Sequence, residues 1–237
     1  MTEPILQVER LCAGYGRAQI LYDIDLRVLP GEVVALMGRN GAGKSTTMKA
    51  IVGLIERRGG IVRFDGRDVS SAPPHRIARM GLGWVPEDRR IFTDLTVLEN
   101  LEVGRQPPRA GAPTWTVETL FGLFPNLAEM PHRLGARMSG GEQQMLTVAR
   151  TLMGNPRLVL LDEPSEGVAP VIVEQMARSI NEMKRQGLSV LLSEQNLHFA
   201  EQVCDRAYVL EKGQVRFEGT LAALETDEAV RRAYLSV

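Results

Sequence analysis

The sequence predicts an α/β fold in which helices cover a largely parallel β-sheet. The first observation is that apolar runs at 33–37 and 158–161 are typical of strands buried on both faces. The second is that stretches with apolar residues at helical spacing alternate with such runs along the chain. Strands that alternate with helices favour a parallel sheet. The same pattern predicts a small antiparallel β-subdomain at the N-terminal end and a mainly helical insert in the middle.

Composition limits the class of protein. The chain has 237 residues, 44% of them apolar, which is enough for a substantial core. The net charge of −1 and the 5% of aromatic residues argue against a nucleic-acid partner. Cys12 and Cys204 lie far apart and show no metal spacing, so we expect reduced, packed thiols. No secretory leader and no run of ~20 apolar residues is visible, which predicts a cytoplasmic protein.

The segment before residue 33 predicts an antiparallel sheet. Apolar residues alternate with mostly polar neighbours from Ile20 through Tyr22 to Val28, as in a half-exposed strand, and Pro30-Gly31 ends the pattern. A second strand is expected around 6–8. Two further strands are expected at 61–64, ended by Asp-Gly, and at 81–85, ended by proline.

A phosphate-binding loop lies between the apolar run 33–37 and a helical pattern that includes Met48, Ile51, Val52 and Ile55. The loop fits G-x-x-x-x-G-K-[ST], and a strand-to-helix turn is the context that this motif requires. Lys44 would bring a charge to the outer phosphates, and the Ser45 hydroxyl would bind Mg²⁺. An accidental glycine-rich turn is the alternative. The predicted ATP-binding residues are Gly38, Arg39, Asn40, Gly41, Ala42, Gly43, Lys44, Ser45 and Thr46.

From Asp88 the chain carries prolines, glycines and short helical patterns at 97–103 and 117–123. A longer helix is expected to open at 138–142, to continue through Met145, Val148, Ala149 and Leu152 at helical spacing, and to end at Gly-Asn-Pro, 154–156. Its start, 139–143 (SGGEQ), places a serine and two glycines at a helix N-terminus, which makes a second anion site. A flexible helix cap is the alternative there. We expect one domain, 1–237, with a nucleotide-binding core at 1–87 and 155–237 and a helical subdomain at 88–154.

An acid pair follows the apolar run 158–161. Asp162 and Glu163 stand at the carboxyl end of the predicted strand, the edge at which ligands bind in open parallel sheets. Asp162 is placed to hold Mg²⁺, and Glu163 is placed to accept a proton from attacking water. A solvated acidic strand end is the alternative.

The remaining pattern completes the α/β alternation. A helix is expected at 173–183, ended by Gly187, followed by a strand at 190–192 and a helix at 197–204. A hairpin across Lys212-Gly213 joins strands at 207–210 and 215–217, and Thr220 caps a last helical segment.

The order of these motifs resembles the ATP-binding subunit of ABC transporters over nearly the full length of the chain. The resemblance implies a P-loop NTPase (RecA-like) core and a head-to-tail dimer that holds two ATP molecules and Mg²⁺. Each ATP would contact the phosphate loop of one chain and the signature residues of the other: Ser139, Gly140, Gly141, Glu142 and Gln143. Tyr15 matches the aromatic residue that stacks on adenine, although a partly buried sheet tyrosine is the alternative. Membrane permease subunits would hold the chain at the inner face of the membrane.

Four stretches are similar to LivF-type subunits, which serve branched-chain amino-acid importers: 39–45, 85–92, 139–146 and 193–196. Close relatives of that group serve urea, short amides and other amino acids. The resemblance further implies an extracytoplasmic solute-binding protein in the complex. It also implies a second, different ATP-binding subunit, so that the working transporter contains a heterodimer.

Three positions depart from the general pattern of the family. Glu87 stands where most members carry a glutamine that senses the γ-phosphate and Mg²⁺, which makes it a candidate metal contact. Gln195 replaces the switch histidine, and Ala169 replaces an aspartate. Glutamine can donate a hydrogen bond but cannot become a cation, so we expect slower hydrolysis at the site that contains Gln195. Arg89 and Arg90 are a permease contact or a solvated charged turn.

Two other classes of protein compete with this interpretation. An ABC ATPase that acts on DNA or ribosomes usually carries coiled coils, zinc inserts or two ATPase units in one chain. A P-loop kinase or GTPase has no use for the SGGEQ helix, and the chain has no N-K-x-D motif. We therefore expect an ATPase subunit that powers solute import.

Overall fold

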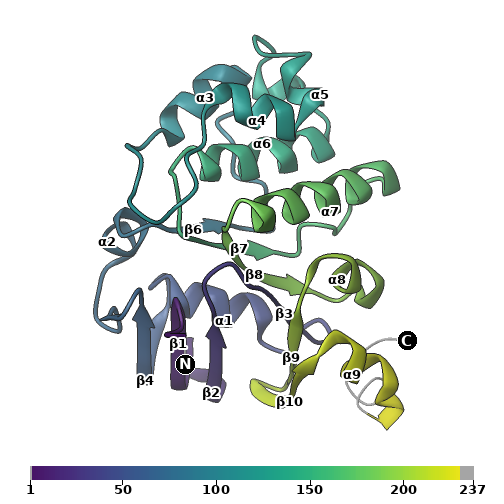
Figure 1. Ribbon diagram of the computed structural model, residues 1–237. Helices are drawn as coiled ribbons and strands as arrows, with labels where there is room; N and C mark the ends of the chain where they lie inside the picture. Colours follow the sequence, from purple (N-terminus) through teal and green to yellow (C-terminus); the bar gives the residue numbers. More distant parts are fainter. Residues whose placement is uncertain (1, 230–237) are drawn as a thin grey trace.

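The computed structural model describes residues 2–229 and contains two β-sheets (Figure 1). The larger sheet has the strand order β10-β9-β3-β8-β7-β6, and every neighbouring pair is parallel except the β9–β10 hairpin. Its strands are β3 (Val33–Met37), β6 (Leu82–Val85), β7 (Leu158–Asp162), β8 (Ser189–Glu194), β9 (Arg206–Glu211) and β10 (Gln214–Thr220). The predicted α/β fold is confirmed.

The smaller sheet is antiparallel and has the order β2-β1-β4-β5, as expected for the N-terminal part. Its strands are β1 (Leu6–Tyr15), β2 (Ala18–Val28), β4 (Glu56–Phe64) and β5 (Arg67–Asp68). The alternation expected from Ile20 through Tyr22 to Val28 does not hold over the whole of β2. Asp23 has a positive φ of 50°, and the register with β1 shifts there. This irregularity turns Leu21 into the core and leaves Tyr22 exposed.

The helices lie where the apolar periodicity predicts them, with three exceptions. The predicted first helix was too long: it ends at Ile51 rather than near Ile55, because Gly53 with φ 78° turns the chain away. Two short helices, α2 and α5, were not predicted. The helices are α1 (Lys44–Ile51), α2 (Pro74–Arg79), α3 (Val97–Gly104), α4 (Val117–Leu123), α5 (Pro125–Ala128), α6 (Gly140–Leu152), α7 (Pro170–Arg185), α8 (Leu197–Val203) and α9 (Leu221–Thr226).

Alternation along the parallel strands divides the core between the two faces of the sheet. Val34 and Leu36 belong to one cluster with Met48 of α1 and the inner face of the antiparallel sheet. Val33 belongs to a second cluster, which contains the buried residues of α6 and α7. Helix α1 therefore packs between the two sheets, while α3–α6 gather at the opposite end of the molecule (Figure 1).

The register of the parallel sheet brings four strand ends to one edge. Met37 pairs with Glu194 between β3 and β8, and Asp162 pairs with Ser193 between β7 and β8. The end of β6 is level with these, since its last residue pairs with the penultimate residue of β7. Residues that follow these strands therefore meet at the carboxyl edge of the sheet: Gly38, Glu87, Glu163 and Gln195.

Candidate functional site

The phosphate-binding loop joins β3 directly to α1, which begins at Lys44. Gly43 has φ 110°, and a Cβ atom there would lie 2.9 Å from Cδ2 of Leu21, so a larger residue would strain the backbone and clash. The Thr47 hydroxyl donates to the carbonyl of Gly43 at 2.8 Å and fixes the end of the loop. The N-terminal amides of α1 thus point into the loop, where they can bind phosphate.

A cavity of about 510 Å³ opens beside this loop, a size typical of ligand sites. Nine of the predicted site residues line it: Tyr15, Asn40, Gly41, Gly43, Lys44, Ser45, Thr46, Glu87 and Glu163. Two further residues line it that the sequence analysis did not select, Ile20 and Glu166. Tyr15 is exposed, so its ring is accessible to a ligand.

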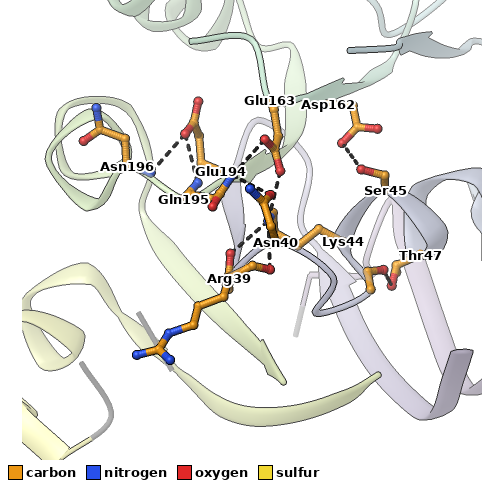
Figure 2. A network of polar contacts seen from close by, with 12 residues as sticks. Arg39, Asn40, Lys44, Ser45, Thr47, Asp162, Glu163, Glu194, Gln195 and Asn196 are labelled. Carbon is orange, nitrogen blue, oxygen red and sulfur yellow. Dashed lines mark hydrogen bonds and ion pairs between the residues drawn. The ribbon is translucent and has the colours of Figure 1, made fainter. Parts of the chain in front are cut away.

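Lys44 forms a buried ion pair with the second residue of the acid pair (Figure 2). Its Nζ lies 2.9 Å from Oε1 of Glu163, and the two side chains are only 3% and 7% exposed. The same ammonium donates to the carbonyl of Gly38 at 2.8 Å. Lys44, which is expected to bind phosphate, therefore also holds the carboxylate of Glu163, which is expected to accept a proton from water.

The Gln195 amide links Glu163 to the phosphate-binding loop (Figure 2). Its Nε2 donates to Oε2 of Glu163 at 3.0 Å and to Oδ1 of Asn40 at 2.8 Å, so both amide hydrogens are used within the chain. Burial alone would raise the pKa of Glu163. Hydrogen bonds from Glu166 and Lys44 and the charge of Lys44 outweigh burial, and the pKa of Glu163 is lowered. Glu163 is consequently ionised at neutral pH and can accept a proton.

Ser45 and Asp162 provide adjacent oxygen atoms at the base of the site. The Ser45 hydroxyl donates to Oδ1 of Asp162 at 2.9 Å, and Asp162 is buried. Burial raises the pKa of Asp162, and the neighbouring charges of Glu163 and Glu87 raise it further. A cation at this position would relieve that repulsion. A hydroxyl and carboxylates form the set of hard oxygen ligands that Mg²⁺ prefers, so the residues present fit this metal.

Glu166 is a second carboxyl group beside Glu163 that no sequence motif indicated. Its backbone N–H donates to the carbonyl of Glu163 at 3.1 Å, and its side chain lines the same cavity. The hydrogen bond with Glu163, burial and the nearby negative charges raise the pKa of Glu166 to about 7. Its only signal in the sequence is its place in the short loop after the acid pair.

We predict that Glu166 titrates near pH 7. Because its pKa is raised, the folded chain binds this proton more tightly than the unfolded chain does. The resulting stabilisation is complete below the ordinary value of 4.5 and is lost as the pH rises through about 7. NMR titration of ¹³C-labelled glutamate, with Glu166→Gln to assign the signal, measures the midpoint. A midpoint near 4.5 for Glu166 would contradict the prediction.

The signature residues begin α6 and do not reach the Lys44 cavity. Ser139 and Glu142 form a capping box, in which the Ser139 N–H donates to Glu142 at 2.6 Å. The Gln143 amide donates to the carbonyls of Gly135 and Met138 at 3.3 and 3.2 Å. Glu142 and Gln143 therefore stabilise their own chain, while Ser139 is exposed. Contact of this segment with ATP bound to a second chain stays a prediction.

Arg89 and Arg90 have different environments, although nothing in the sequence distinguishes them. The Arg89 guanidinium donates to the carbonyls of Glu166 and Gly167 at 3.0 and 3.1 Å. It also lies against the start of α6, since a Cβ atom on Gly140 would approach its Nη1 to 2.3 Å. Arg90 is exposed and pairs with Asp88 at 2.7 Å. Arg89 thus holds the loop that follows Glu163, whereas Arg90 lies at the surface in an ion pair with Asp88.

Ala169 is the N-cap of α7 and forms no side-chain capping bond. An aspartate at this position, as in most of the family, would accept a hydrogen bond from the first turn of the helix. Alanine at an N-cap costs about 1 kcal/mol relative to such a residue. The loop between Glu163 and α7 is therefore less firmly tied to the helix here.

The comparisons with known proteins identify the class of protein. The sequence profile of the ABC transporter family matches residues 21–166. The chain belongs to this family and is an ATP-binding subunit, an ATPase whose hydrolysis is coupled to transport. Such subunits act with membrane permease subunits; within residues 2–229, no helix is long and apolar enough to cross a membrane.

Two kinds of transport system occur among the relatives. The chain is 42% identical to the high-affinity branched-chain amino acid transport ATP-binding protein BraG of Pseudomonas aeruginosa, over 98% of this chain and 99% of BraG. It is 36% identical to the lipopolysaccharide export system ATP-binding protein LptB of Haemophilus influenzae, over 98% and 97%. The probable LivF of Archaeoglobus fulgidus is 32% identical, over 98% and 99%. The predicted LivF-type family is confirmed.

Solved structures agree with this assignment. The structure of MJ1267, an ATP-binding cassette of an ABC transporter, superposes with a TM-score of 0.82 and 27% identity over 98% of both chains. A further ATP-binding subunit of an ABC transporter gives a TM-score of 0.80 and 31% identity, over 97% of this chain and 95% of that chain. The predicted P-loop NTPase architecture is thereby confirmed.

Proposed function

We propose that this chain powers the import of branched-chain amino acids through separate permease subunits. The observation that carries the proposal is the 42% identity with BraG along nearly the whole of both chains. Export of a lipid is the second candidate, favoured by the 36% identity with LptB. An extracytoplasmic solute-binding protein would deliver the amino acid to the import complex.

Within the site, each group has a distinct role in this proposal. Lys44 and the amides of the phosphate-binding loop bind the phosphates of ATP, and Tyr15 stacks on the adenine. Ser45 and Asp162, with Glu87 at the rim of the cavity, hold Mg²⁺, which neutralises phosphate charge when bound. Glu163 accepts the proton of the attacking water, and Gln195 orients Glu163 through the 3.0 Å hydrogen bond.

Reconstitution tests the solute. The chain, its permease subunits, a second ATP-binding subunit and the binding protein are placed in liposomes with ATP on the ATPase side. We expect uptake of labelled leucine, isoleucine or valine and an ATPase rate that these amino acids raise. Uptake restricted to urea, amides or other amino acids would reject the assigned solute. Extraction of lipid in place of uptake would favour the second candidate.

The same system tests the heterodimer. Gln195 cannot become a cation, so we propose that the site containing Lys44, Glu163 and Gln195 is the slower of two. Glu163→Gln in this chain is then expected to reduce transport less than the matching change in the sister subunit. Equal losses, or full transport with this chain as the only ATPase, would reject the asymmetry.

Replacing Asp162 by asparagine is predicted to raise the Mg²⁺ requirement. The change keeps the shape of the side chain and the bond to Ser45 but removes the charge that a cation would offset. We expect the Mg²⁺ concentration for half-maximal ATPase to rise about tenfold, which corresponds to about 1.4 kcal/mol. Nucleotide affinity without Mg²⁺ is the control and should not fall. An unchanged Mg²⁺ requirement would remove Asp162 from the metal site.

We propose that the helical segment 88–154 carries the permease contact, next to a second cavity of about 440 Å³. Phe92 and Val103 line this cavity and are 49% and 54% exposed, which is unusual for large apolar side chains. Arg90 stands at its edge with its guanidinium over Trp84. The segment 87–92 joins this surface to the ATP site.

Arg90→Glu is predicted to lower transport while the ATPase rate of the isolated chain stays within about twofold. The side chain is exposed and contacts Asp88 and Trp84 rather than residues that line the Lys44 cavity. Its charge therefore acts on this surface and on what docks there. Arg89→Glu is the matched comparison and should lower both activities, because Arg89 holds the loop after Glu163. Unchanged solute uptake in Arg90→Glu would count against a permease contact at this surface.

A further inference from the structure

Glu194 carries a buried carboxylate at the end of β8, beside the ATP site (Figure 2). It is 3% exposed, and both of its oxygens are fully engaged. Oε1 accepts from the hydroxyl of Ser165 and from its backbone N–H, the latter at 3.3 Å. Oε2 accepts from the backbone N–H groups of Gln195 at 3.0 Å and Asn196 at 3.1 Å. One carboxylate therefore joins two loops that are separated by about thirty residues of sequence.

Each of these loops carries one partner of the hydrogen bond between Gln195 and Glu163. Ser165 lies two residues after Glu163, and Gln195 donates through Nε2 to Glu163 at 3.0 Å. The chain segment 163–165, the Glu194 carboxylate and the Gln195 side chain therefore form a closed ring of covalent and hydrogen bonds. Movement of either loop would change the distance between the Gln195 amide and the Glu163 carboxylate.

We propose that Glu194 is a positioning residue for ATP hydrolysis, which fixes the Glu163 carboxylate relative to the Gln195 amide. This inference rests on the proposed role of Glu163 as the base. Glu194 itself touches neither substrate nor reacting water. It acts through the two loops, and its effect is on the rate of the chemical step rather than on ATP binding.

The chemistry of the position supports a role beyond packing. Burial raises the pKa of Glu194, and hydrogen bonds from Ser165, Asn196 and Gln195 oppose that rise. No lysine or arginine within the described range 2–229 forms an ion pair with it. A buried carboxylate without a cation is costly, and it is stable here only because four donors converge on it. A glutamine would place an NH₂ group against donors on one side, so the ring could not close in the same geometry.

The test measures ATP affinity and turnover for three variants in a transporter whose sister subunit has lost its own base, so that turnover reports the site containing Lys44 and Glu163. Glu194→Gln is expected to lower kcat about 10- to 100-fold, since small misplacements of catalytic groups have effects of this size. The Kd for ATP should stay within about threefold. Ser165→Ala removes the hydroxyl link alone and should lower kcat less, and Ser165→Thr, which keeps the hydroxyl, should restore it.

A double-variant cycle separates positioning from a general loss of stability. In a Gln195→Ala background the ring is already open. Adding Glu194→Gln should then change log kcat by less than half as much as the same substitution does in the wild type. Glu32→Gln is the control for a general loss of stability. Glu32 accepts the backbone N–H of Leu29 at 2.8 Å and pairs with Arg206 at 2.6 Å, but it precedes β3 at the opposite edge of the sheet. It should affect thermal stability and not kcat.

Three results would overturn the inference: an unchanged kcat in Glu194→Gln, full additivity with Gln195→Ala, or an equal loss of kcat in Glu32→Gln. If Glu194→Gln does not fold, the Ser165 pair decides in its place, and equal rates for Ser165→Ala and Ser165→Thr would reject the role. An inactive Glu163→Gln with a normal Glu194→Gln would reject this inference alone. A fully active Glu163→Gln would instead reject the proposed base.

Discussion

Glu163→Gln is expected to bind Mg-ATP with near wild-type affinity and to lose nearly all turnover. The carboxylate is ionised in the folded chain and lies at the cavity between Lys44 and Gln195, where a proton acceptor for water is needed. A positioned general base contributes about 10² to 10⁴ in rate, so we expect kcat to fall at least a hundredfold. The amide keeps the size of the side chain and can still contact Gln195.

Binding should survive because the substitution also removes a competitor for Lys44. In the wild type the ammonium is held by the Glu163 carboxylate at 2.9 Å, and a neutral amide leaves it free for phosphate. Equilibrium binding of labelled ATP and single-turnover hydrolysis measure the two effects, and size exclusion with ATP detects a stable closed dimer. Glu166→Gln, the same substitution in the same loop, is the control and should retain far more activity. Hydrolysis within threefold of the wild type in Glu163→Gln would refute the base role.

Much of the site could be predicted because its parts are local in sequence. The phosphate-binding loop is recognised from its motif together with the predicted strand before it and the predicted helix after it. The structure has both, β3 and α1. The acid pair follows a short apolar run, and the structure confirms the predicted buried strand there, β7. Since parallel strands share a carboxyl edge, the sequence could also place Lys44 near Glu163 without any knowledge of their distance.

The contacts that the sequence could not provide are those between distant segments. The bond from Gln195 to Asn40 spans 155 residues, and that from Arg89 to Glu166 spans 77. No periodicity indicates that Arg89 turns inward while Arg90 faces solvent. Glu194 lies within the stretch 193–196 that resembles LivF-type subunits, but the sequence does not distinguish a buried carboxylate at a strand end from a solvated one.

Local irregularities account for the errors in the fold. The alternation in β2 is correct at Val28 but fails at Tyr22, because the positive φ of Asp23 shifts the phase of the strand. Helix α1 ends earlier than predicted, before Gly53, because the spacing of apolar residues gives no information about a glycine between them. The boundary of the helical subdomain at 154 stays a prediction. Buried residues of α6, such as Met145, share one cluster with Val159 of β7.

Lys44→Ala is expected to weaken ATP binding or hydrolysis severely and also to destabilise the folded chain. Loss of one preorganised contact to the phosphates costs about 3 kcal/mol, roughly a hundredfold in affinity or rate. The structure adds a second effect that the motif alone does not predict. Removal of the ammonium leaves Glu163 buried without its cation, and breaking a buried ion pair in this way costs about 3 kcal/mol. Poor binding by Lys44→Ala alone would therefore be ambiguous.

The double variant Lys44→Ala/Glu163→Gln separates the two effects. A neutral amide needs no cation, so the double variant should unfold at a higher denaturant concentration than Lys44→Ala does. Its binding of ATP should stay as weak as that of Lys44→Ala, because the phosphate contact is absent in both. Denaturant unfolding of the wild type, both single variants and the double variant gives the coupling energy of the pair. Near wild-type turnover in a folded Lys44→Ala chain would exclude Lys44 from phosphate binding, and additive losses of stability would show that the ion pair does not stabilise the fold.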